Sequence, residues 1–284
     1  MTRNPTVARR AEELLGAAVA ATAPVAGGDI CTATRVKVAD GRTVLMKTHV
    51  RPPAGFFDAE ARSLRWLNAA APDLVPEVLA VDTDCLLLPF IETGKPSVDA
   101  AARLGRELAA LHATGATTYG WEQDGFIGRL PLKNAPAPSW PEFYATRRVL
   151  PYLKLARDRG HATAEHAQAI EGVLGRLAQL VPEEPPARLH GDLWSGNVLW
   201  ATDGRVWLVD PAAYGGHREV DLAMLALFGL PLLQQVIEAY ETVTPLADGW
   251  QERQGLHQLF PLLTHAAMFG GGYAARAADL ARRF

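Results

Sequence analysis

Cysteine is scarce in this sequence, and its scarcity limits the class of protein. The 284 residues include only Cys31 and Cys85. Two cysteines cannot form a disulfide framework, and no Cys/His spacing along the chain resembles a zinc site. A reducing cytosol is therefore the default compartment, and we expect a cytoplasmic protein.

Long hydrophobic runs are also missing. The run Leu222–Leu233 is broken by Gly229 and Pro231 and is too short to span a bilayer. Another apolar run, Leu14–Ala23, follows two arginines, as in a signal peptide. Two glutamates stand between those arginines and the run, and the run is rich in alanine rather than leucine. We therefore expect an amphipathic first helix there, and no membrane span.

The chain lacks an excess of basic charge. Its net charge is −3 and its pI is about 6.2, which gives no long-range attraction for nucleic acid or an anionic membrane. Neither is expected as a partner. Lysine is much rarer than arginine, so each lysine position is informative: Lys37, Lys47, Lys95, Lys133 and Lys154.

The first third of the sequence is rich in predicted strands. The segment GGDICTATRVKVADGRTVLMKTHV shows β-branched alternation on both sides of Asp40-Gly41, which predicts two strands joined by a hairpin turn. A helix is expected from about Phe57 to Asn68. Short strands are expected near Val78–Val81 and Leu86–Phe90.

The pattern changes after ETGKPS, residues 92–97, which has the composition of a linker. Helices are predicted at Ala100–Ala113, Pro141–Arg157 and Ala162–Leu180, and in the segments beyond Glu219. Between them, residues 198–210 read as a short hairpin with an Asp-Gly turn. We therefore predict an α+β chain of two lobes, with a small β-rich N-lobe over residues 1–92 and a larger helical C-lobe over residues 93–284.

Lys47 is the first candidate functional residue. It ends the predicted strand TVLMK, whose apolar residues turn at least one face inward, so its ammonium needs a partner if it is buried. On the following helix, Glu60 falls on the same apolar stripe as Phe57, Leu64 and Leu67. One interpretation is a structural ion pair, or two unrelated side chains that reach solvent. The other is a lysine held by a glutamate, with its ammonium free to contact an anionic ligand.

The segment HGDLWSGN fits the catalytic-loop pattern H-x-D-L-x-x-x-N of phosphoryl-transfer enzymes. Asp192 would accept the proton of an attacking hydroxyl, and Asn197 would offer a side-chain oxygen to a metal. Asp210 ends the apolar strand VWLVD, where its carboxylate could hold Mg²⁺ beside Asn197. The loop by itself could be a polar turn. With the lysine and glutamate upstream, it predicts a phosphotransferase that uses ATP and Mg²⁺.

The remaining nucleotide-binding residues are less clearly marked. A kinase-type G-x-G-x-x-G is missing, and only Gly27-Gly28 precedes the first strand of the hairpin. These glycines are either a plain turn or a place where backbone N–H groups cover phosphates. The segment LLLPFI could be the connection that binds adenine. Pro89 would accept with its C=O, Ile91 would donate its N–H, and Phe90 lies between them.

Two longer segments, LHGDLWSGNVLW and VDPAAYGGHREVDLAM, resemble the fructosamine kinase (ketosamine-3-kinase) family. That family belongs to the aminoglycoside-phosphotransferase-like branch of the protein-kinase-like fold. The resemblance runs through most of the chain, including FFDAEARSLRWL, WPEFYATRR and HQLFPLLTHAAMFGGGY. It implies ATP-dependent phosphorylation of the sugar 3-hydroxyl of a ketosamine, the adduct of a sugar and an amine. The 3-phosphate product is unstable, so the implied role is repair by deglycation.

The family pattern assigns a role to each candidate residue. Asp192 would be the base, and Asn197 and Asp210 would be the Mg²⁺ ligands. Lys47 and Glu60 would form the phosphate-binding pair. We therefore expect the N-lobe, residues 1–92, to bind the nucleotide and the C-lobe, residues 93–284, to carry the catalytic and substrate-binding residues.

One further position is expected to support the catalytic loop, and two others depart from the family pattern. Asp221, in EVDLA, resembles the buried aspartate that braces the catalytic-loop backbone in this fold. Members often carry glutamine in the stretch that reads IGRLPLKN here, where this chain has Leu132, so the pocket differs if that glutamine touches substrate. Some members carry a redox-linked cysteine directly after the glycines, where this chain has Asp29. Cys31 is expected to be a packed strand residue.

A ketosamine is a polyol attached to an amine, so aromatic faces suit its C–H surface and carboxylates suit a protonated amine. Trp194, inside the catalytic loop, is expected to border the acceptor hydroxyl, although a tryptophan there could equally serve packing. His217 and Glu219 follow Asp210 and could line the acceptor side. The alternative for Glu219 is to cap the helix that follows.

Two rival functions stay open from the sequence. A kinase of the same fold could act on an aminoglycoside, choline or another small alcohol. An aminoglycoside pocket would gather carboxylates, however, and those beyond Glu219 are widely spaced. A pseudokinase would bind nucleotide without chemistry, yet every expected catalytic group is present. The identity of the ketosamine, free or protein-bound, and the oligomeric state stay open.

Overall fold

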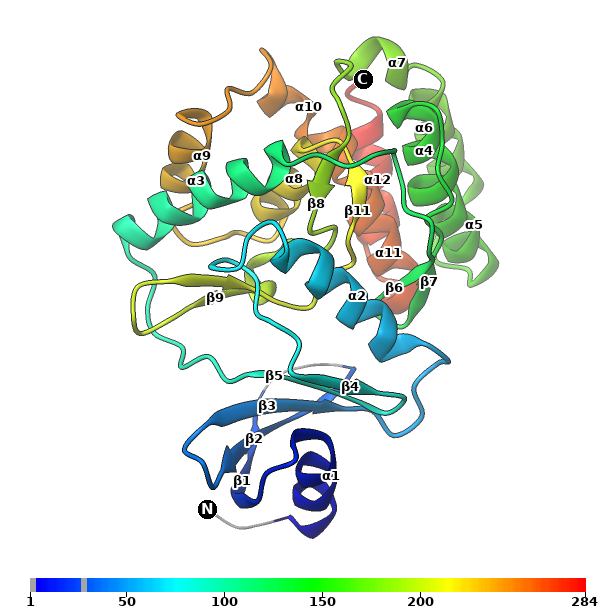
Figure 1. The fold of residues 1–284 in the computed structure, drawn as a ribbon. Helices are drawn as coiled ribbons and strands as arrows, with labels where there is room; N and C mark the ends of the chain where they lie inside the picture. The colour runs from blue at the N-terminus through cyan, green and yellow to red at the C-terminus, as the bar shows by residue number, and fades with distance from the viewer. Residues whose placement is uncertain (1–3, 27–29) are drawn as a thin grey trace.

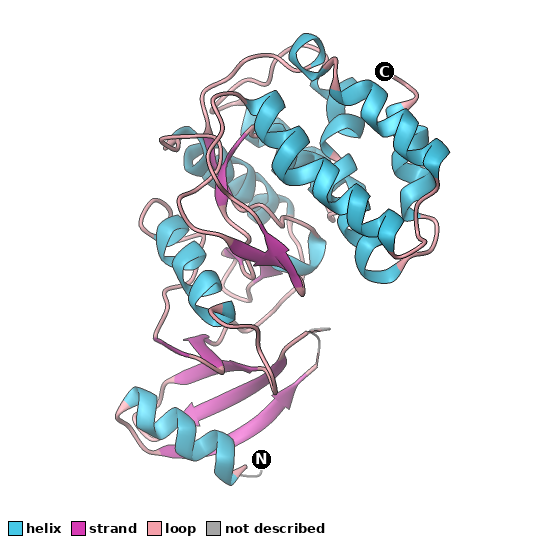
Figure 2. Ribbon diagram, turned by 90° about the vertical axis from the view of Figure 1, so that its right-hand side faces the viewer, coloured by secondary structure: helices cyan, strands magenta, loops and turns pink. Residues whose placement is uncertain are grey.

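The computed structural model describes residues 4–26 and 30–284 and confirms the two-lobe α+β fold. Strands gather in the small lobe at the lower end of Figure 1, and helices make up most of the large lobe above it. Figure 2 shows the same division from the side, with helix α1 (Pro5–Leu15) against the strands of the small lobe. Within the described residues, no helix is both long and apolar enough to cross a membrane.

Helix α1 ends earlier than the sequence predicts. Asn4 caps its start by accepting two backbone N–H groups with its side chain, and Gly16 closes it in the left-handed region at φ +64°. The run Leu14–Ala23, expected to be helical, contributes only its first two residues to α1 and then enters strand β1 (Val19–Val25). The amphipathic helix exists, but it precedes this run because the glycine stops it.

The small lobe is a five-stranded antiparallel sheet with the order β1-β2-β3-β5-β4. Its other strands are β2 (Thr32–Val38), β3 (Thr43–Thr48), β4 (Ala80–Asp82) and β5 (Cys85–Pro89). The predicted hairpin is confirmed, because β2 and β3 pair on either side of Asp40-Gly41. Asp40 accepts the backbone N–H of Arg42, and Gly41 takes φ +96°. Strand β1, which the sequence did not predict, pairs with β2 at the edge.

The first 92 residues contribute to two separate cores. Helix α1 and the sheet enclose a small core that includes Ala8 and Met46. Helix α2 (Phe56–Asn68), close to its predicted bounds, lies between the sheet and the large lobe (Figure 1). Its Leu64 shares a core with Leu193 of the catalytic loop. Helix α2 therefore ties the small lobe to that loop and fixes the glutamate that it carries.

The large lobe holds the other helices, and the predicted boundary at residue 92 falls between β5 and the first of them. They are α3 (Val98–Ala113), α4 (Trp140–Phe143), α5 (Leu150–Asp158), α6 (Ala164–Leu174), α7 (Leu177–Leu180), α8 (Glu219–Leu227), α9 (Leu233–Glu241), α10 (Trp250–His257), α11 (Leu259–Phe269) and α12 (Tyr273–Ala281). Predicted helix Pro141–Arg157 contains a π-helical segment at Tyr144–Val149. Predicted helix Ala162–Leu180 is interrupted after Leu174.

The large lobe also contains short paired strands. They are β6 (Gly125–Ile127) with β7 (Leu130–Leu132), β8 (Ala187–Leu189) with β11 (Tyr214–Gly216), and β9 (Val198–Trp200) with β10 (Val206–Leu208). The pair β9–β10 is the predicted hairpin, whereas the other two pairs were not predicted. Strand β8 leads into the catalytic loop and β9 leaves it, so pairing fixes both ends of the loop.

Helices α3 and α9 cross closely at Gly105. A Cβ at this position would lie 2.1 Å from the backbone oxygen of Val236 and 2.9 Å from the backbone nitrogen of Tyr240. Gly105→Ala should therefore lower the free energy of unfolding by about 2–3 kcal/mol, measured by urea denaturation. Gly172→Ala is the matched control, because an added Cβ on this exposed position of α6 meets no atom within 4 Å. The control should keep or raise stability; equal losses in both variants would contradict the close crossing.

Candidate active site

A cleft of about 670 Å³ is lined by residues of both lobes. Its lining includes these predicted site residues: Lys47, Glu60, Pro89, Phe90, Ile91, Asp192, Trp194, Asn197 and Asp210. Gly28 lies outside the described residues, so its predicted phosphate contact stays a prediction. His217 and Glu219 are not part of the lining. The structure thus brings together residues that lie as much as 163 positions apart in the chain.

Lys47 lies on β3 and is buried between two carboxylates. Its Nζ donates to Glu60 Oε1 at 2.5 Å and to Asp210 Oδ1 at 2.8 Å. Burial by itself lowers the pKa of Lys47, but Asp210 and Glu60 outweigh it and raise the pKa above its usual value. The lysine therefore stays charged. The predicted pair with Glu60 is confirmed, and the contact with Asp210 extends it across the cleft.

Asp210 adopts a backbone conformation that few non-glycine residues take, with φ +56°. It follows β10, and the preceding Val209 donates its N–H to the backbone oxygen of Asn197 at 3.0 Å. The Asp210 side chain is 49% exposed while one of its oxygens contacts Lys47. The turn after β10 therefore presents a carboxylate to the cleft that is held at one oxygen and open to solvent.

A buried aspartate anchors the backbone of the catalytic loop. Asp221 accepts the backbone N–H of His190 at 2.8 Å and that of Gly191 at 3.0 Å, which is the bracing that the family resemblance implies. His112 of α3 contacts the same carboxylate at 3.1 Å. Gly191 takes φ +81°, and a Cβ there would lie 2.1 Å from the backbone oxygen of Ala212. Only glycine fits this bend.

Asp192 and Asn197 are joined across the loop. Asn197 Nδ2 donates to the backbone oxygen of Asp192 at 2.8 Å and to its carboxylate Oδ2 at 3.3 Å. Loss of solvent in the cleft and the charge of Asp210 raise the pKa of Asp192 to about 7. A carboxylate with a raised pKa, held in a fixed direction, is the arrangement expected of a general base.

The donor atoms around Asp210 suit a hard cation. Asn197 uses its amide nitrogen for the loop, which leaves its side-chain oxygen as the atom for a ligand. Asp210 uses one carboxylate oxygen for Lys47, which leaves the other. Carboxylate and amide oxygens are the ligands that Mg²⁺ takes in proteins. The side chains of Asn197 and Asp210 therefore fit the metal that the sequence predicts, and they would supply its protein ligands.

The strand end at Pro89–Ile91 forms the cleft wall on the small-lobe side. Phe90 donates its backbone N–H to Thr43 at 3.1 Å, which continues the ladder between β3 and β5. Its ring lies under the guanidinium of Arg35, 4.5 Å from the ring centroid. Phe90 therefore shapes the wall by packing, while the backbone groups of Pro89 and Ile91 stay the predicted contacts for adenine.

Trp194 lies across the turn of the catalytic loop. A Cβ at Gly196 would be 2.3 Å from its indole Cη2, so the ring rests directly over that glycine. Its edge meets the ring of Phe228 at a centroid distance of 6.0 Å. The side chain is in the cleft lining and 39% exposed. It is therefore not a packed core residue, and its free surface faces bound ligands or solvent.

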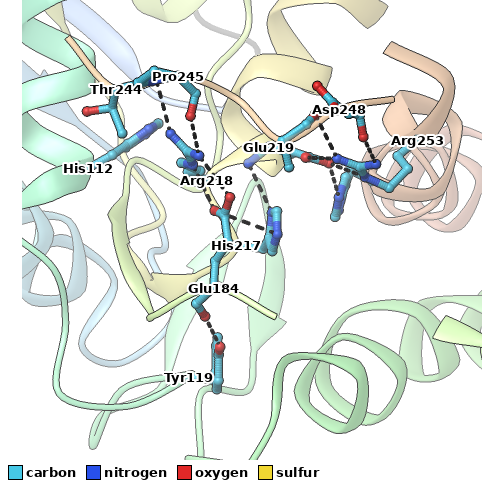
Figure 3. A network of polar contacts seen from close by, with 12 residues as sticks. His112, Tyr119, Glu184, His217, Arg218, Glu219, Thr244, Pro245, Asp248 and Arg253 are labelled. Atoms are coloured by element: carbon cyan, nitrogen blue, oxygen red, sulfur yellow. Dashed lines mark hydrogen bonds and ion pairs between the residues drawn. The ribbon is translucent and has the colours of Figure 1, made fainter. Parts of the chain in front are cut away.

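The structure places His217 and Glu219 outside the cleft, in a buried polar network (Figure 3). Burial by itself would raise the pKa of Glu219, but its bonds with His257 and Arg253 lower that pKa to about 2. His217 accepts the backbone N–H of Glu219 at 3.3 Å. From their position after Asp210, both residues could have lined the acceptor side, and a cap of the following helix was the alternative for Glu219. The chain instead turns inward through β11, and Glu219 stands at the start of α8.

One part of the cleft wall could not be predicted from the sequence. Trp121 and Asn134, which flank the β6–β7 hairpin, line the cleft with Leu132. Arg148 of the π-helical segment is fully buried and donates to Asn134 Oδ1 at 2.5 Å. Its guanidinium lies 3.8 Å from the ring centroid of Tyr214. No local sequence pattern indicates this part of the wall, because Arg148, which supports it, lies in a different element.

Comparisons with known proteins agree with this geometry. The family model "Fructosamine kinase" matches residues 4–284. A probable ketoamine kinase of Enterococcus faecium is 34% identical over 265 residues, which cover 92% of this chain and 94% of the relative. A probable ketoamine kinase of Thermus thermophilus is 37% identical over 250 residues, covering 88% of each chain.

Solved structures place the chain in the same group. A Thermobifida fusca protein assigned as a fructosamine-3-kinase has a TM-score of 0.93 at 47% identity, covering 98% of this chain and 97% of its own. A choline kinase of Streptococcus pneumoniae has a TM-score of 0.67 at 16% identity, covering 98% of each chain, and shares the fold alone. With the predicted phosphoryl-transfer residues gathered in one cleft, the chain belongs to the fructosamine kinase family and is an ATP-dependent kinase.

Proposed function

We propose that this kinase transfers the γ-phosphoryl group of ATP, in the presence of Mg²⁺, to the sugar 3-hydroxyl of a ketosamine. The observation that carries this function is the chain of contacts through the cleft. Lys47 contacts Asp210 at 2.8 Å, and Asn197 bonds to the carboxylate of Asp192 at 3.3 Å. The names of the relatives, ketoamine kinase and fructosamine-3-kinase, support a sugar-amine acceptor and its 3-position.

The donor side of the cleft would hold the nucleotide. Lys47 would neutralise phosphate oxygens, since its charge is fixed by two carboxylates and is partly shielded from water. Asn197 and Asp210 would hold Mg²⁺, which when bound supplies further positive charge to the phosphate oxygens. Pro89 and Ile91 would bind the adenine edge with backbone C=O and N–H groups.

The acceptor side would orient the sugar. Asp192 would take the proton of the 3-hydroxyl as that oxygen forms its bond to the γ-phosphorus and the bond to ADP breaks. The bond from Asn197 to Asp192 keeps the carboxylate in place before the hydroxyl arrives. Trp194 would lie against the C–H surface of the sugar. Proton transfer and positioning then account for the whole contribution of these residues.

The product would carry phosphate on the carbon next to the ketone. Enolisation of the ketone toward the amine-bearing carbon makes the phosphate an allylic leaving group, so inorganic phosphate departs. Hydrolysis then frees the amine. The cellular role would be removal of sugar from amines, in the cytoplasm where ATP is available. Free and protein-borne ketosamines would both undergo this chemistry.

A polycationic acceptor such as an aminoglycoside suits the cleft less well. Among the described lining residues, the acidic ones are Glu60, Asp124, Asp192 and Asp210. Two of these are committed to Lys47. Asp124 pairs with Lys133 at 2.6 Å and accepts the backbone N–H of Asn134 at 3.0 Å. The base Asp192 is thus the remaining carboxylate for a ligand in this lining.

The decisive assay uses the purified protein with ATP, Mg²⁺ and fructosyl-lysine. We expect the substrate to gain the mass of one phosphoryl group while ADP forms in equal amount. Turnover of choline or an aminoglycoside with none on any ketosamine would contradict the proposed substrate. Bound ATP with no turnover on any alcohol would identify a pseudokinase instead.

Trp194→Ala should raise the KM for the ketosamine about tenfold and leave the KM for ATP unchanged, because it removes an aromatic contact on the acceptor side only. Steady-state kinetics with each substrate varied in turn measures both constants. Trp207→Ala is the matched control, since Trp207 lies on the neighbouring β10 and is not part of the cleft lining. An unchanged ketosamine KM in Trp194→Ala would assign the indole to packing.

A further inference from the structure

Five aromatic side chains form a continuous row that starts at the catalytic loop. The aromatic row consists of Trp194, Phe228, His265, Phe269 and Tyr273. Ring centroids lie 6.0 Å apart from Trp194 to Phe228 and 5.0 Å apart from Phe228 to His265. From His265 the row forks, at 5.7 Å to Phe269 and 5.2 Å to Tyr273. Each step is within the range of direct ring contact.

The row is assembled from elements that the fold brings to the loop. Phe228 directly follows α8, and its backbone oxygen accepts a hydrogen bond from the Ser195 hydroxyl at 3.4 Å. His265 and Phe269 are four residues apart on α11 and therefore share one helix face. Tyr273 is the first residue of α12. The loop and three helices thus contribute to one surface.

Trp194 and Phe269, at opposite ends of the row, are open to solvent. Trp194 is 39% exposed and Phe269 is 52% exposed, while Phe228, His265 and Tyr273 are partly buried. Large apolar side chains are exposed at several of the described positions, and the aromatic ones among them are Trp194 and Phe269. An exposed aromatic surface that adjoins a catalytic loop is the kind of patch that binds a ligand.

A separate contact places the end of α11 beside the cleft. Gly128, in the β6–β7 turn, lines the cleft, and a Cβ added to it would lie 2.8 Å from the sulfur of Met268. Met268 is the neighbour of Phe269 at the end of α11. The end of α11 therefore touches the wall of the cleft.

We propose that the aromatic row binds the substituent on the ketosamine nitrogen and selects substrates in which that substituent is apolar or aromatic. The inference rests on the proposed function. When the sugar 3-hydroxyl meets Asp192, the amine is two carbons further along the sugar chain, so its substituent emerges near Trp194. The protonated amine suits the faces of these rings. No carboxylate belongs to the row, so it selects by apolar contact rather than by charge.

The test compares two ketosamines that share the sugar and differ only in the amine, N-benzyl and N-methyl. In the unmodified enzyme, we expect the KM of the N-benzyl adduct to be about tenfold lower than that of the N-methyl adduct. Phe269→Ala should raise the KM of the N-benzyl adduct about fivefold, with no change in kcat or in the N-methyl KM. Phe269→Trp should keep the preference, because it restores an aromatic face.

Val243→Ala is the matched control, since Val243 is 46% exposed and lies on the α9–α10 connection away from the row. It should leave both constants unchanged. Equal KM values for the two adducts, or the same behaviour in Phe269→Ala and Val243→Ala, would overturn the inference while phosphorylation of the N-methyl adduct leaves the proposed function standing. Failure to phosphorylate either adduct would overturn both.

Discussion

Asp192→Asn is expected to lower kcat about 1,000-fold, with little change in the affinity for ATP. The amide keeps the shape of the side chain but cannot take the proton of the attacking hydroxyl. The carboxylate of Asp192 accepts from Asn197, whereas Lys47 bonds to Glu60 and Asp210. The substitution therefore leaves the lysine and its two carboxylates in place. Kinetics under saturating substrates and a nucleotide-binding titration measure the two effects separately.

The matched control is Asp203→Asn, in the exposed turn of the β9–β10 hairpin. Asp203 accepts hydrogen bonds from Arg205, two residues further along the turn, and is not part of the cleft lining. This variant should keep near-normal kcat. If Asp192→Asn also kept near-normal kcat, another group would have to be the base.

Lys47→Met is expected to lower kcat/KM for ATP at least about 100-fold. The substitution removes the positive charge that contacts Glu60 at 2.5 Å and Asp210 at 2.8 Å. Two carboxylates then face each other and the phosphates without a counter-charge. A buried carboxylate without its partner also destabilises a fold, so we expect a loss of about 3 kcal/mol in the free energy of unfolding. Lys37→Met, at an exposed position of β2, is the matched control.

A double variant separates the two interpretations of Lys47. Lys47→Met with Glu60→Gln removes the uncompensated charge of the buried glutamate, so most of the lost stability should return. Activity should stay at the level of Lys47→Met, because the phosphate contact is still missing. Recovery of both stability and activity would mean that Lys47 serves only as a structural partner of Glu60.

The sequence predicted the parts of the site that follow from local periodicity. Glu60 was placed toward Lys47 because it shares a helical stripe with apolar residues, and the structure joins the two at 2.5 Å. The catalytic loop was recognisable because the spacing of Asp192 and Asn197 lies within eight residues. The hairpin at Asp40-Gly41 was recognisable because its turn chemistry is local. In each case the residues that carry the sequence pattern also form the structure that it predicts, within one short segment.

The rest could not be predicted because it depends on contacts between distant elements. The bond of Lys47 to Asp210 spans 163 positions. The wall around Asn134 is held by the buried Arg148, which no spacing links to the loop. Proximity in sequence was also misleading. Glu219 stands nine positions after Asp210, yet it turns into the core toward Arg253.

The end of the first helix illustrates a related limit. The run Leu14–Ala23 is apolar enough for either a helix or a strand, and its alanine content favours a helix. The left-handed Gly16 stops the helix, and pairing with β2 makes the remainder a strand. Tertiary pairing therefore overrides the local preference. The aromatic row could not be read from the sequence for the same reason, since its rings come from four segments.

Transfer of phosphate to the 3-hydroxyl of a ketosamine predicts a specific coupling pattern in the ³¹P spectrum of the product. We propose to record the ³¹P spectrum of fructosyl-lysine phosphorylated by this enzyme, cooled before the product decomposes. A phosphate on the 3-carbon gives a doublet, and a ¹H–³¹P correlation must assign the coupled proton to the carbon next to the ketone rather than to another secondary carbon. A triplet from a primary hydroxyl, or no phosphate ester from any ketosamine, would contradict the account.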